Sequence, residues 1–170
     1  SVSRQNYNLI EYIIIDGGSS DSTIRIINNY KNHIDFFVSE NDFGLYDAMN
    51  KGIDNATGDI IGILNSDDLY SSDNVITKVV EAFEKNNFNA LYGDLVYVDR
   101  KNTNHIKRYW RSSSSNVTSF IQGWHPPHPT LFIKKSVYES YGFFDLNYPL
   151  ASDFELMFRF FHIFRVSHFY

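Results

Sequence analysis

The chain has 170 residues, no cysteine, 17% aromatic residues and a formal net charge of −5. This length predicts one domain over residues 1–170, and the composition excludes a disordered chain, disulfides and thiolate metal sites. A negatively charged chain without a basic run is not expected to bind nucleic acid, because affinity for phosphates comes from clustered Lys and Arg. No apolar run approaches the roughly 18 residues that span a bilayer. Both ends are expected to continue into a longer chain.

The first elements expected are a strand, a glycine-rich turn and a helix. A β-branched run predicts the strand over residues 12–15, residues 16–21 form the turn, and apolar residues at helical spacing predict a helix over residues 22–32. Asp21 or Ser22 is the expected N-cap. Such a turn can cradle a nucleotide, although it lacks the glycine spacing of dinucleotide-binding and P-loop motifs.

A second strand is expected over residues 36–39, and a helix begins at Leu45 after a polar loop. Leu45, Met49 and Ile53 make one apolar stripe of this helix, which turns Asp47 toward another face. A turn then leads into the next strand.

That next strand, over residues 60–64, ends abruptly in Asn65-Ser66-Asp67-Asp68. Its apolar run suits a strand buried on both faces, and ligands of open α/β sheets bind beyond the carboxyl ends of the strands. Adjacent carboxylates repel, so Asp67 and Asp68 would be stabilised by sharing Mg²⁺ or Mn²⁺, with phosphates as further ligands. The same residues are also ordinary loop and helix-capping residues, and this alternative stays open.

The middle of the chain predicts a core-packed helix and three short strands. The helix follows an N-cap at Asp73 or Asn74, and its apolar residues recur with helical spacing from Ile76. A Gly-Asp turn dipeptide and a polar turn separate the strands, so this half is expected to be antiparallel or mixed. The strands are expected over residues 90–92, 95–98 and 106–110.

Three prolines make residues 123–129 rigid and exclude a helix there. A strand over residues 130–133 and a short helix over residues 136–141 are expected to follow. His125 and His128 lie in the proline-rich segment, where histidines stabilise a rigid loop more often than they bind a metal.

The last helix is expected to begin with a capping box made by Ser152 and Glu155. Asp153 then lies in the first helical turn, where the helix dipole favours a charged carboxylate. Stabilisation of the helix N-terminus alone would explain an acidic residue at this position.

Six short segments follow one another along the chain and are more informative together than singly. They are Ile13-Ile-Ile-Asp16-Gly-Gly-Ser-Ser-Asp-Ser-Thr23, Gly44-Leu-Tyr-Asp47-Ala-Met-Asn-Lys-Gly52, Leu64-Asn-Ser-Asp-Asp68, Pro127-His-Pro-Thr-Leu-Phe132, Gly142-Phe-Phe-Asp145 and Ala151-Ser-Asp-Phe-Glu-Leu156. In this order they resemble the family 2 glycosyltransferases, particularly bacterial enzymes of exopolysaccharide and O-antigen assembly. The resemblance runs from about residue 1 to residue 159.

The resemblance implies an α/β fold of the GT-A type, a three-layer sandwich with a mixed central sheet. It also implies a nucleotide-sugar donor, a divalent metal and inversion at the anomeric carbon. Family members open with a strand and a turn that precede the first residues of this sequence. The central sheet is therefore expected to lack its first strand.

The resemblance also assigns the donor side of the site. Asp16 matches an acid that contacts the donor nucleoside, with Gly17 in the same turn, and Asp47 matches the acid that holds the base or ribose. The segment from Asn65 to Asp68 falls on the Asp-x-Asp-type metal motif. Because Asn65 replaces the usual first acid, Asp67 and Asp68 are left to carry the metal, and Asp67 also faces the donor.

On the acceptor side, Asp153 aligns with the expected general base. An acceptor hydroxyl must lose its proton as it attacks the anomeric carbon, and a carboxylate can accept that proton. The metal would stabilise charge on the leaving diphosphate. The resemblance places His128 near the acceptor and diphosphate as a further candidate. Trp124 and Tyr46 either stack on a sugar or base or belong to the core.

The function implied is an inverting transfer of a sugar from a nucleoside diphosphate donor, UDP by family default, to a hydroxyl of a glycan or lipid-linked acceptor. The expected location is cytoplasmic, with peripheral association at the inner face of the plasma membrane left open. A noncatalytic nucleotide-sugar-binding remnant is the alternative, because the first strand is missing and Asn65 is neutral. A nucleotidyltransferase is disfavoured, because no Gly-rich triphosphate loop with Lys or Arg occurs.

Overall fold

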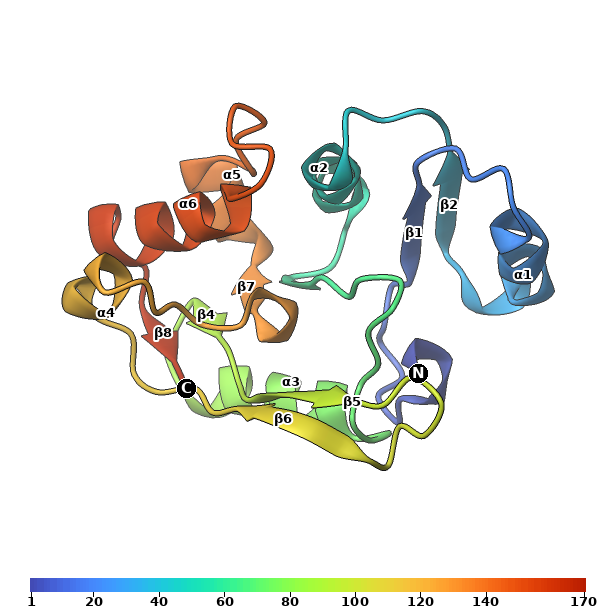
Figure 1. Cartoon of the computed structure of the whole chain (residues 1–170). Coiled ribbons are helices and arrows are strands. Elements are labelled where there is room, and N and C mark those ends of the chain that lie inside the picture. Colours follow the sequence, from blue (N-terminus) through green and yellow to red (C-terminus); the bar gives the residue numbers. More distant parts are fainter.

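The computed structural model describes all residues, 1–170, and shows a mixed α/β fold (Figure 1). The helices are α1 (Thr23–Asn29), α2 (Leu45–Asn55), α3 (Val75–Lys85), α4 (Val117–Ile121), α5 (Lys135–Tyr141) and α6 (Ser152–Phe158). The strands are β1 (Ile13–Asp16), β2 (Phe36–Ser39), β3 (Ile60–Gly62), β4 (Ala90–Leu91), β5 (Leu95–Val98), β6 (Ile106–Trp110), β7 (Phe132–Lys134) and β8 (His168–Phe169). Single 3-10 turns cover Val2–Arg4, Lys31–His33 and His128–Thr130, and a π-helical turn, Arg159–Ile163, continues α6.

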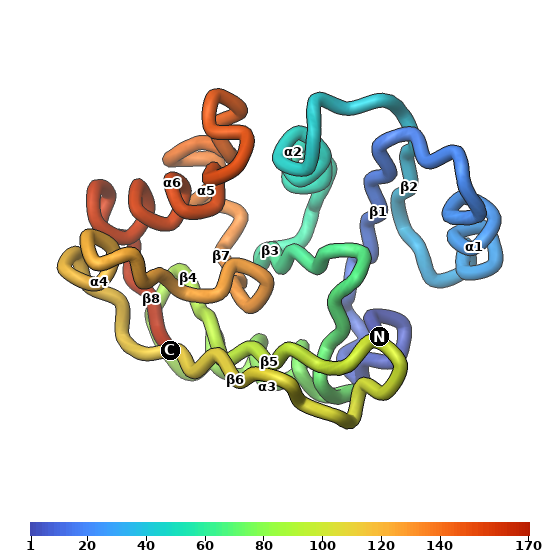
Figure 2. The backbone as a smooth tube through the Cα atoms, viewed as in Figure 1, coloured from blue at the N-terminus to red at the C-terminus, as the bar shows by residue number.

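The strands form three separate ladders (Figure 2). β1 pairs in parallel with β2, β5 pairs with β6 in antiparallel orientation, and the third ladder has the order β3-β7-β4-β8. This third ladder contains antiparallel and parallel pairs, so the expected mixed sheet is confirmed. β1 pairs only with β2, and β3 pairs only with β7, so β1 and β3 belong to different ladders.

The main core joins α2, the β3-β7-β4-β8 ladder and the two C-terminal helices. Ile53 of α2, Ile133 of β7 and Phe160 after α6 are almost completely buried in it. The apolar stripes of these segments supply the hydrophobic free energy that holds the helices on the sheet. The site residues carried by α2 and α6 are thereby positioned on a common scaffold.

A second, smaller core packs α3 against the other side of β7 through Phe132, Val79 and Phe83. Gly62 of β3 pairs with Phe132, and a Cβ at Gly62 would overlap the Phe132 ring. Glycine at this position therefore lets the aromatic ring lie across the neighbouring strand. This close approach fixes β3, whose end leads into the acidic pair.

The capping box expected at the last helix is wrong. The N-cap of α6 is Ala151, and the hydroxyl of Ser152 is buried without a hydrogen-bond partner. Glu155 pairs instead with Arg159, at 2.7 Å between Oε1 and Nε. The ion pair one turn along the helix competes successfully for the Glu155 carboxylate.

Other differences arise where tertiary contacts decide the structure. The segment expected as one strand over residues 90–92 and its neighbour over 95–98 do not pair, because β4 joins β7 and β8 whereas β5 joins β6. The helix α4 and the strand β8 were not expected at all. A 3-10 turn also forms over His128–Thr130, within the segment where prolines were expected to exclude helix, and β7 starts only at Phe132. No helix of the structure combines the length and the hydropathy needed to cross a bilayer.

Candidate functional site

Asp16 ends β1 and is only 7% exposed. Its Oδ2 accepts hydrogen bonds from the amides of Gly18 (3.1 Å) and Ser19 (2.9 Å) and from Ser39 Oγ (2.6 Å), while Oδ1 accepts one from Ser19 Oγ (2.5 Å). Burial raises the pKa of Asp16, but these hydrogen bonds outweigh burial and leave the pKa below its ordinary value. Asp16 therefore shapes the turn after β1 and ties it to β2.

Gly17 lies where that turn meets the loop leading into α2. A Cβ at Gly17 would overlap the carboxylate of Asp42. Asp42 in turn accepts a hydrogen bond from the amide of Gly44 at 2.9 Å. The absence of a side chain at Gly17 thus allows the two loops to lie against each other.

Asp47 lies in the first turn of α2. Its Oδ2 accepts a hydrogen bond from the amide of Phe43 (3.1 Å) and lies 3.3 Å from Lys51 Nζ. The bond from Phe43 and the charge of Lys51 lower the pKa of Asp47. The carboxylate therefore accepts a hydrogen bond from an amide just before the helix, and its negative charge interacts favourably with the helix dipole.

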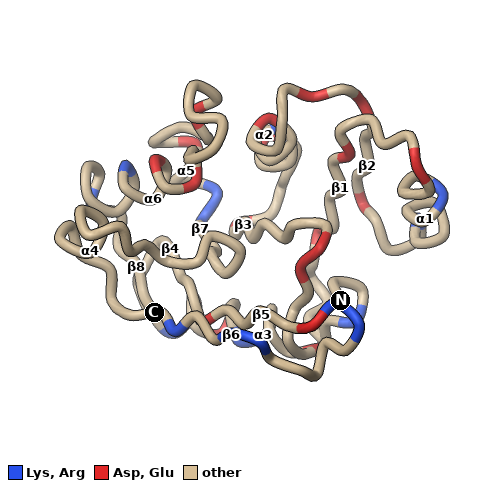
Figure 3. Tube along the Cα trace, in the orientation of Figure 1, with Lys and Arg blue, Asp and Glu red and all other residues tan.

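Acidic residues, red in Figure 3, also follow β3. Asn65 donates from Nδ2 to Asp68 Oδ2 at 3.1 Å, and the amide of Asp68 donates to the carbonyl of Asn65 at 3.0 Å. Asn65 Oδ1 is buried without any hydrogen-bond partner, and Asp67 is exposed and makes no hydrogen bond or ion pair. An unsatisfied buried oxygen is costly, so this segment presents oxygen atoms that are available to a ligand.

His128 lies in the 3-10 turn before β7 and is partly exposed. Burial lowers its pKa, the charges of Asp153 and Asp68 act in the opposite direction, and His125 adds to the lowering. The charges of two acids from distant parts of the chain therefore act on His128. It is held in a neutral form at physiological pH, since the net shift is downward.

Asp153 lies in the first turn of α6 and contacts α2. Tyr46 donates a hydrogen bond from its hydroxyl to Asp153 Oδ1 at 2.8 Å. Burial, and then the hydrogen bond and charge of Asp153, raise the pKa of Tyr46 to about 12. Tyr46 also stacks on Phe144 at 5.4 Å between ring centres. Tyr46 is thus a fixed, protonated donor that orients one oxygen of Asp153.

These contacts divide the residues expected at the site into two groups. The charges of Asp68 and Asp153 both act on His128, and Tyr46 joins this group through its hydrogen bond to Asp153. Asp16, Gly17 and Asp47 shape the loops at the ends of β1 and α2 and make no hydrogen bond to the first group. The two groups are linked through α2, because Tyr46 and Asp47 are consecutive in its first turn.

The oxygen atoms after β3 fit a hard divalent cation that shares its coordination with a substrate. No cluster of three or more His, Asp or Glu side chains is arranged to hold a metal by itself. Mg²⁺ is usually bound through one or two carboxylates together with substrate phosphates and water. The carboxylates of Asp67 and Asp68 and the unpartnered Oδ1 of Asn65 match that donor set.

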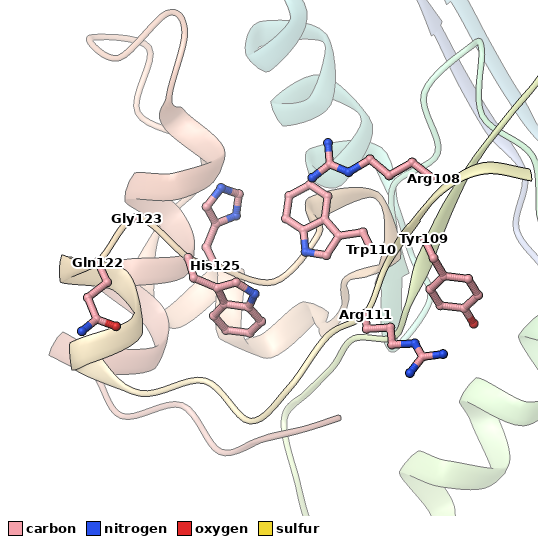
Figure 4. Close-up of a pocket in the computed structure, with 8 residues that line it drawn as sticks. Arg108, Tyr109, Trp110, Arg111, Gln122, Gly123 and His125 are labelled. Atoms are coloured by element: carbon pink, nitrogen blue, oxygen red, sulfur yellow. The ribbon is translucent and has the colours of Figure 1, made fainter.

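A cavity of about 480 Å³ lies between β6 and the proline-rich segment (Figure 4). Arg108 and Trp110 of β6 and His125 line it, and Trp110 meets His125 edge-on at 5.8 Å between ring centres. Of these residues, only His125 was considered from the sequence, and Arg108 and Trp110 were read simply as part of a strand. The available signal was the cluster of cationic and aromatic residues over 107–111, although the sequence does not show which segment packs opposite that cluster.

Comparison with known proteins identifies the family. The model of the family described as "Glycosyl transferase family 2" matches residues 1–146. An uncharacterized glycosyltransferase of Mycobacterium tuberculosis is 33% identical over 166 residues, which are 94% of this chain and 60% of that protein. A PGL/p-HBAD biosynthesis glycosyltransferase of Mycobacterium bovis is 27% identical over 163 residues, 94% of this chain and 61% of that protein. The chain thus spans about 60% of the length of these relatives.

Solved structures show the fold. The S. aureus TarS fragment in complex with UDP superposes with a TM-score of 0.67 at 14% identity, over 92% of this chain and 48% of that one. The same fragment in complex with UDP-GlcNAc superposes with a TM-score of 0.60 at 16% identity, over 81% and 40%. These likenesses confirm the expected GT-A fold. The chain belongs to glycosyl transferase family 2.

Proposed function

We propose that the protein transfers a sugar from a nucleoside diphosphate donor, UDP-linked by preference, to a hydroxyl of a glycan or lipid-linked acceptor, with inversion at the anomeric carbon. The observation that carries the proposal is the 2.8 Å hydrogen bond from Tyr46 to Asp153 beside His128. It joins α2 to α6, whose motifs are far apart in the sequence, and the charge of Asp153 also acts on His128. The UDP complexes of the structurally similar TarS support a nucleotide-sugar donor.

Asp153 acts as the general base in this proposal. Tyr46 occupies Oδ1, and no group of the protein donates a hydrogen bond to Oδ2, so Oδ2 is free to accept a proton. The acceptor hydroxyl gives its proton to Asp153 as its oxygen bonds the anomeric carbon. The bond from that carbon to the diphosphate breaks at the same time, and the diphosphate leaves with the electron pair.

Asn65, Asp67 and Asp68 would hold a Mg²⁺ or Mn²⁺ ion together with the donor diphosphate. The ion would neutralise negative charge on the leaving group. His128, kept neutral by burial, can donate a hydrogen bond in the same region without repelling a cation. We assign Asp68, with its hydrogen bond from Asn65, to the leaving-group side of the reaction.

The donor nucleoside is proposed to bind at Asp16, Gly17 and Asp47. The carboxylates of Asp16 and Asp47 are bonded to backbone amides and so hold the surrounding loops in a fixed shape. Those loops, rather than flexible side chains, would make the nucleoside pocket. A lipid-linked acceptor would place the reaction at the cytoplasmic face of the plasma membrane.

A noncatalytic nucleotide-sugar-binding protein is the second candidate, because Asn65 is a neutral residue and the acids do not form a complete metal site alone. Incubation of the full-length protein with a panel of nucleotide sugars and Mn²⁺ separates the two. We expect binding and slow donor hydrolysis, with hydrolysis absent in Asp153→Asn. Binding without hydrolysis or transfer under any condition would favour the noncatalytic protein, and the absence of any binding would refute both.

A further inference from the structure

Arg108 is a cation without an anionic partner in a chain of net charge −5. Its neighbour Lys107 pairs with Asp99 at 2.7 Å, whereas Arg108 makes no ion pair and its side chain makes no hydrogen bond. The guanidinium carbon lies 5.3 Å from the ring centre of Tyr97 and 5.7 Å from that of Trp110. Aromatic contacts hold the guanidinium in place and leave its N–H donors free. The side chain is thus prepared for a planar anionic group.

Alternation along β6 separates its two arginines. Arg108 and Trp110 share one face of the strand, and Figure 4 shows Tyr109 and Arg111 pointing away from Trp110 and His125. Arg111 stacks instead on Tyr109, at 5.4 Å from its ring centre. Both arginines line the cavity, but only Arg108 lies on the Trp110 face of the strand. Lys107, which pairs with Asp99 and does not line the cavity, provides the matched control.

The cavity combines this cation with aromatic surfaces. Trp110 and Trp124 line it together with His125, and its volume of about 480 Å³ lies within the range of ligand pockets, roughly 300–1,000 Å³. Indole rings are rigid and present a broad apolar face with one polar edge. A ligand that has both a ring with an apolar face and a negative charge would satisfy all of these groups.

The cavity adjoins the base rather than the donor loops. His125 meets Trp110 on one side and Phe154 on the other, at 5.6 Å between ring centres, and Phe154 directly follows Asp153. Neither Arg108 nor Trp110 contacts the loops that carry Asp16 and Asp47 by any hydrogen bond, ion pair or ring contact. A molecule in the cavity therefore approaches from the side of Asp153.

We propose that this cavity binds the acceptor, and that the acceptor is a glycan with an anionic group, either a phosphate or a carboxylate, near the attacking hydroxyl. The inference rests on the proposed sugar transfer and adds the chemical class of the acceptor to it. Arg108 binds the anionic group, and Trp110 and Trp124 contact the sugar ring. A neutral glycan would leave Arg108 without a partner, and an inorganic anion would leave the indole rings unused.

Both tryptophans of the given sequence line the cavity, so a ligand that binds there is expected to change tryptophan fluorescence. The full-length protein is titrated with glucose 6-phosphate, glucuronate and methyl glucoside. We expect saturable changes with the two anionic sugars and at least tenfold weaker binding of the neutral one. Arg108→Gln should weaken the anionic sugars about tenfold, as expected for one charge-assisted contact. Lys107→Gln, which removes one positive charge from a residue outside the cavity lining, should change their affinity less than twofold.

Donor binding is measured in parallel by calorimetry with UDP-GlcNAc and Mg²⁺. We expect Arg108→Gln to leave the affinity for UDP-GlcNAc unchanged and to raise the KM of the acceptor in a turnover assay. Equal losses in Arg108→Gln and Lys107→Gln, or equal binding of methyl glucoside, would overturn the anionic acceptor class. Loss of donor binding in Arg108→Gln would show that the cavity serves the donor diphosphate instead. If UDP-GlcNAc binds but no sugar alters the fluorescence, this inference fails while the proposed function stands.

Discussion

The acids on the two sides of the site differ in how fully they are bonded within the protein. Asp16 accepts four hydrogen bonds, and Asp47 accepts one from an amide and pairs with Lys51. After β3, by contrast, Asp67 has no partner. Asp153 receives one hydrogen bond, on one oxygen only.

This difference separates residues that maintain shape from residues that are available for chemistry. A carboxylate saturated by amides and hydroxyls stabilises its loops and has little capacity left for a ligand. A carboxylate with open lone pairs can accept a proton or coordinate a cation. We therefore expect substitutions on the donor side to lower stability and substitutions on the reaction side to lower binding or turnover.

The largest effect is expected from Asp153→Asn. Loss of the base should lower kcat by about 10²- to 10⁴-fold, with the Tm close to that of the wild type. Release of UDP in the presence of an acceptor measures turnover, and thermal unfolding measures the fold. Tyr46→Phe keeps the stacking on Phe144 but loses the hydrogen bond to Asp153, so a smaller loss, about tenfold, is expected. Normal turnover by Asp153→Asn would remove Asp153 from the role of base.

The second largest effect is expected on metal-dependent binding of UDP. Asp68→Asn should weaken UDP binding about 10- to 100-fold in the presence of Mg²⁺, as a lost carboxylate ligand requires, and should have little effect in EDTA. Calorimetry with UDP gives both affinities. Asp73→Asn is the control, because Asp73 is a nearby exposed carboxylate that lies 3.6 Å from Arg4 and outside the site. Identical metal dependence in the two variants would contradict a metal at Asp68.

On the donor side, Asp16→Asn should lower the free energy of unfolding by about 1–3 kcal/mol, because an amide cannot accept all of the bonds made by a buried carboxylate. Denaturant unfolding measures this loss. Ser39→Ala removes one of the bonds and should cost less. A fully stable Asp16→Asn protein would show that the hydrogen bonds around Asp16 contribute little to the fold.

The smallest effect expected is a dependence of stability on pH near neutrality. Burial lowers the pKa of His128 and His162, so the unfolded chain binds more protons and stability falls as the pH drops below their ordinary value of 6.5. The Tm should therefore decrease between pH 7.5 and pH 5.5, and His162→Phe should reduce that decrease. The lowered pKa of Asp16 and Asp47 contributes stability that is lost only below their ordinary value of 3.8. A Tm that does not change between pH 7.5 and pH 5.5 would contradict a lowered pKa of these histidines.

Periodic segments of the sequence predicted their structures well. The strand expected over residues 36–39 is β2, and the helix expected from Leu45 is α2. Met49 and Ile53 of the expected apolar stripe are buried, whereas Leu45 at the start of the helix is exposed. α4 has five residues and β8 has two, which is too short for any period to appear. Asn116 does cap α4 by accepting a hydrogen bond from Ser119 N at 2.9 Å, so one local signal for that helix was present.

The motifs located the candidate site residues, but the sequence could not show how each acid is bonded. Whether Asp16 is saturated depends on Ser39 in another strand, and whether Asp153 is oriented depends on Tyr46, which is 107 residues away. The cavity beside His125 was not predicted for the same reason. It exists only because β6 and the proline-rich segment meet in the fold.

The most direct test compares two variants in one calorimetric titration with UDP and Mg²⁺, followed by a turnover assay of the same samples. We predict that Asp153→Asn binds UDP as the wild type does but transfers sugar about 10²- to 10⁴-fold more slowly, whereas Asp68→Asn binds UDP about 10- to 100-fold more weakly in the presence of Mg²⁺. Unchanged UDP binding by Asp68→Asn, together with lost binding by Asp153→Asn, would contradict the division of the site into a leaving-group side and a base.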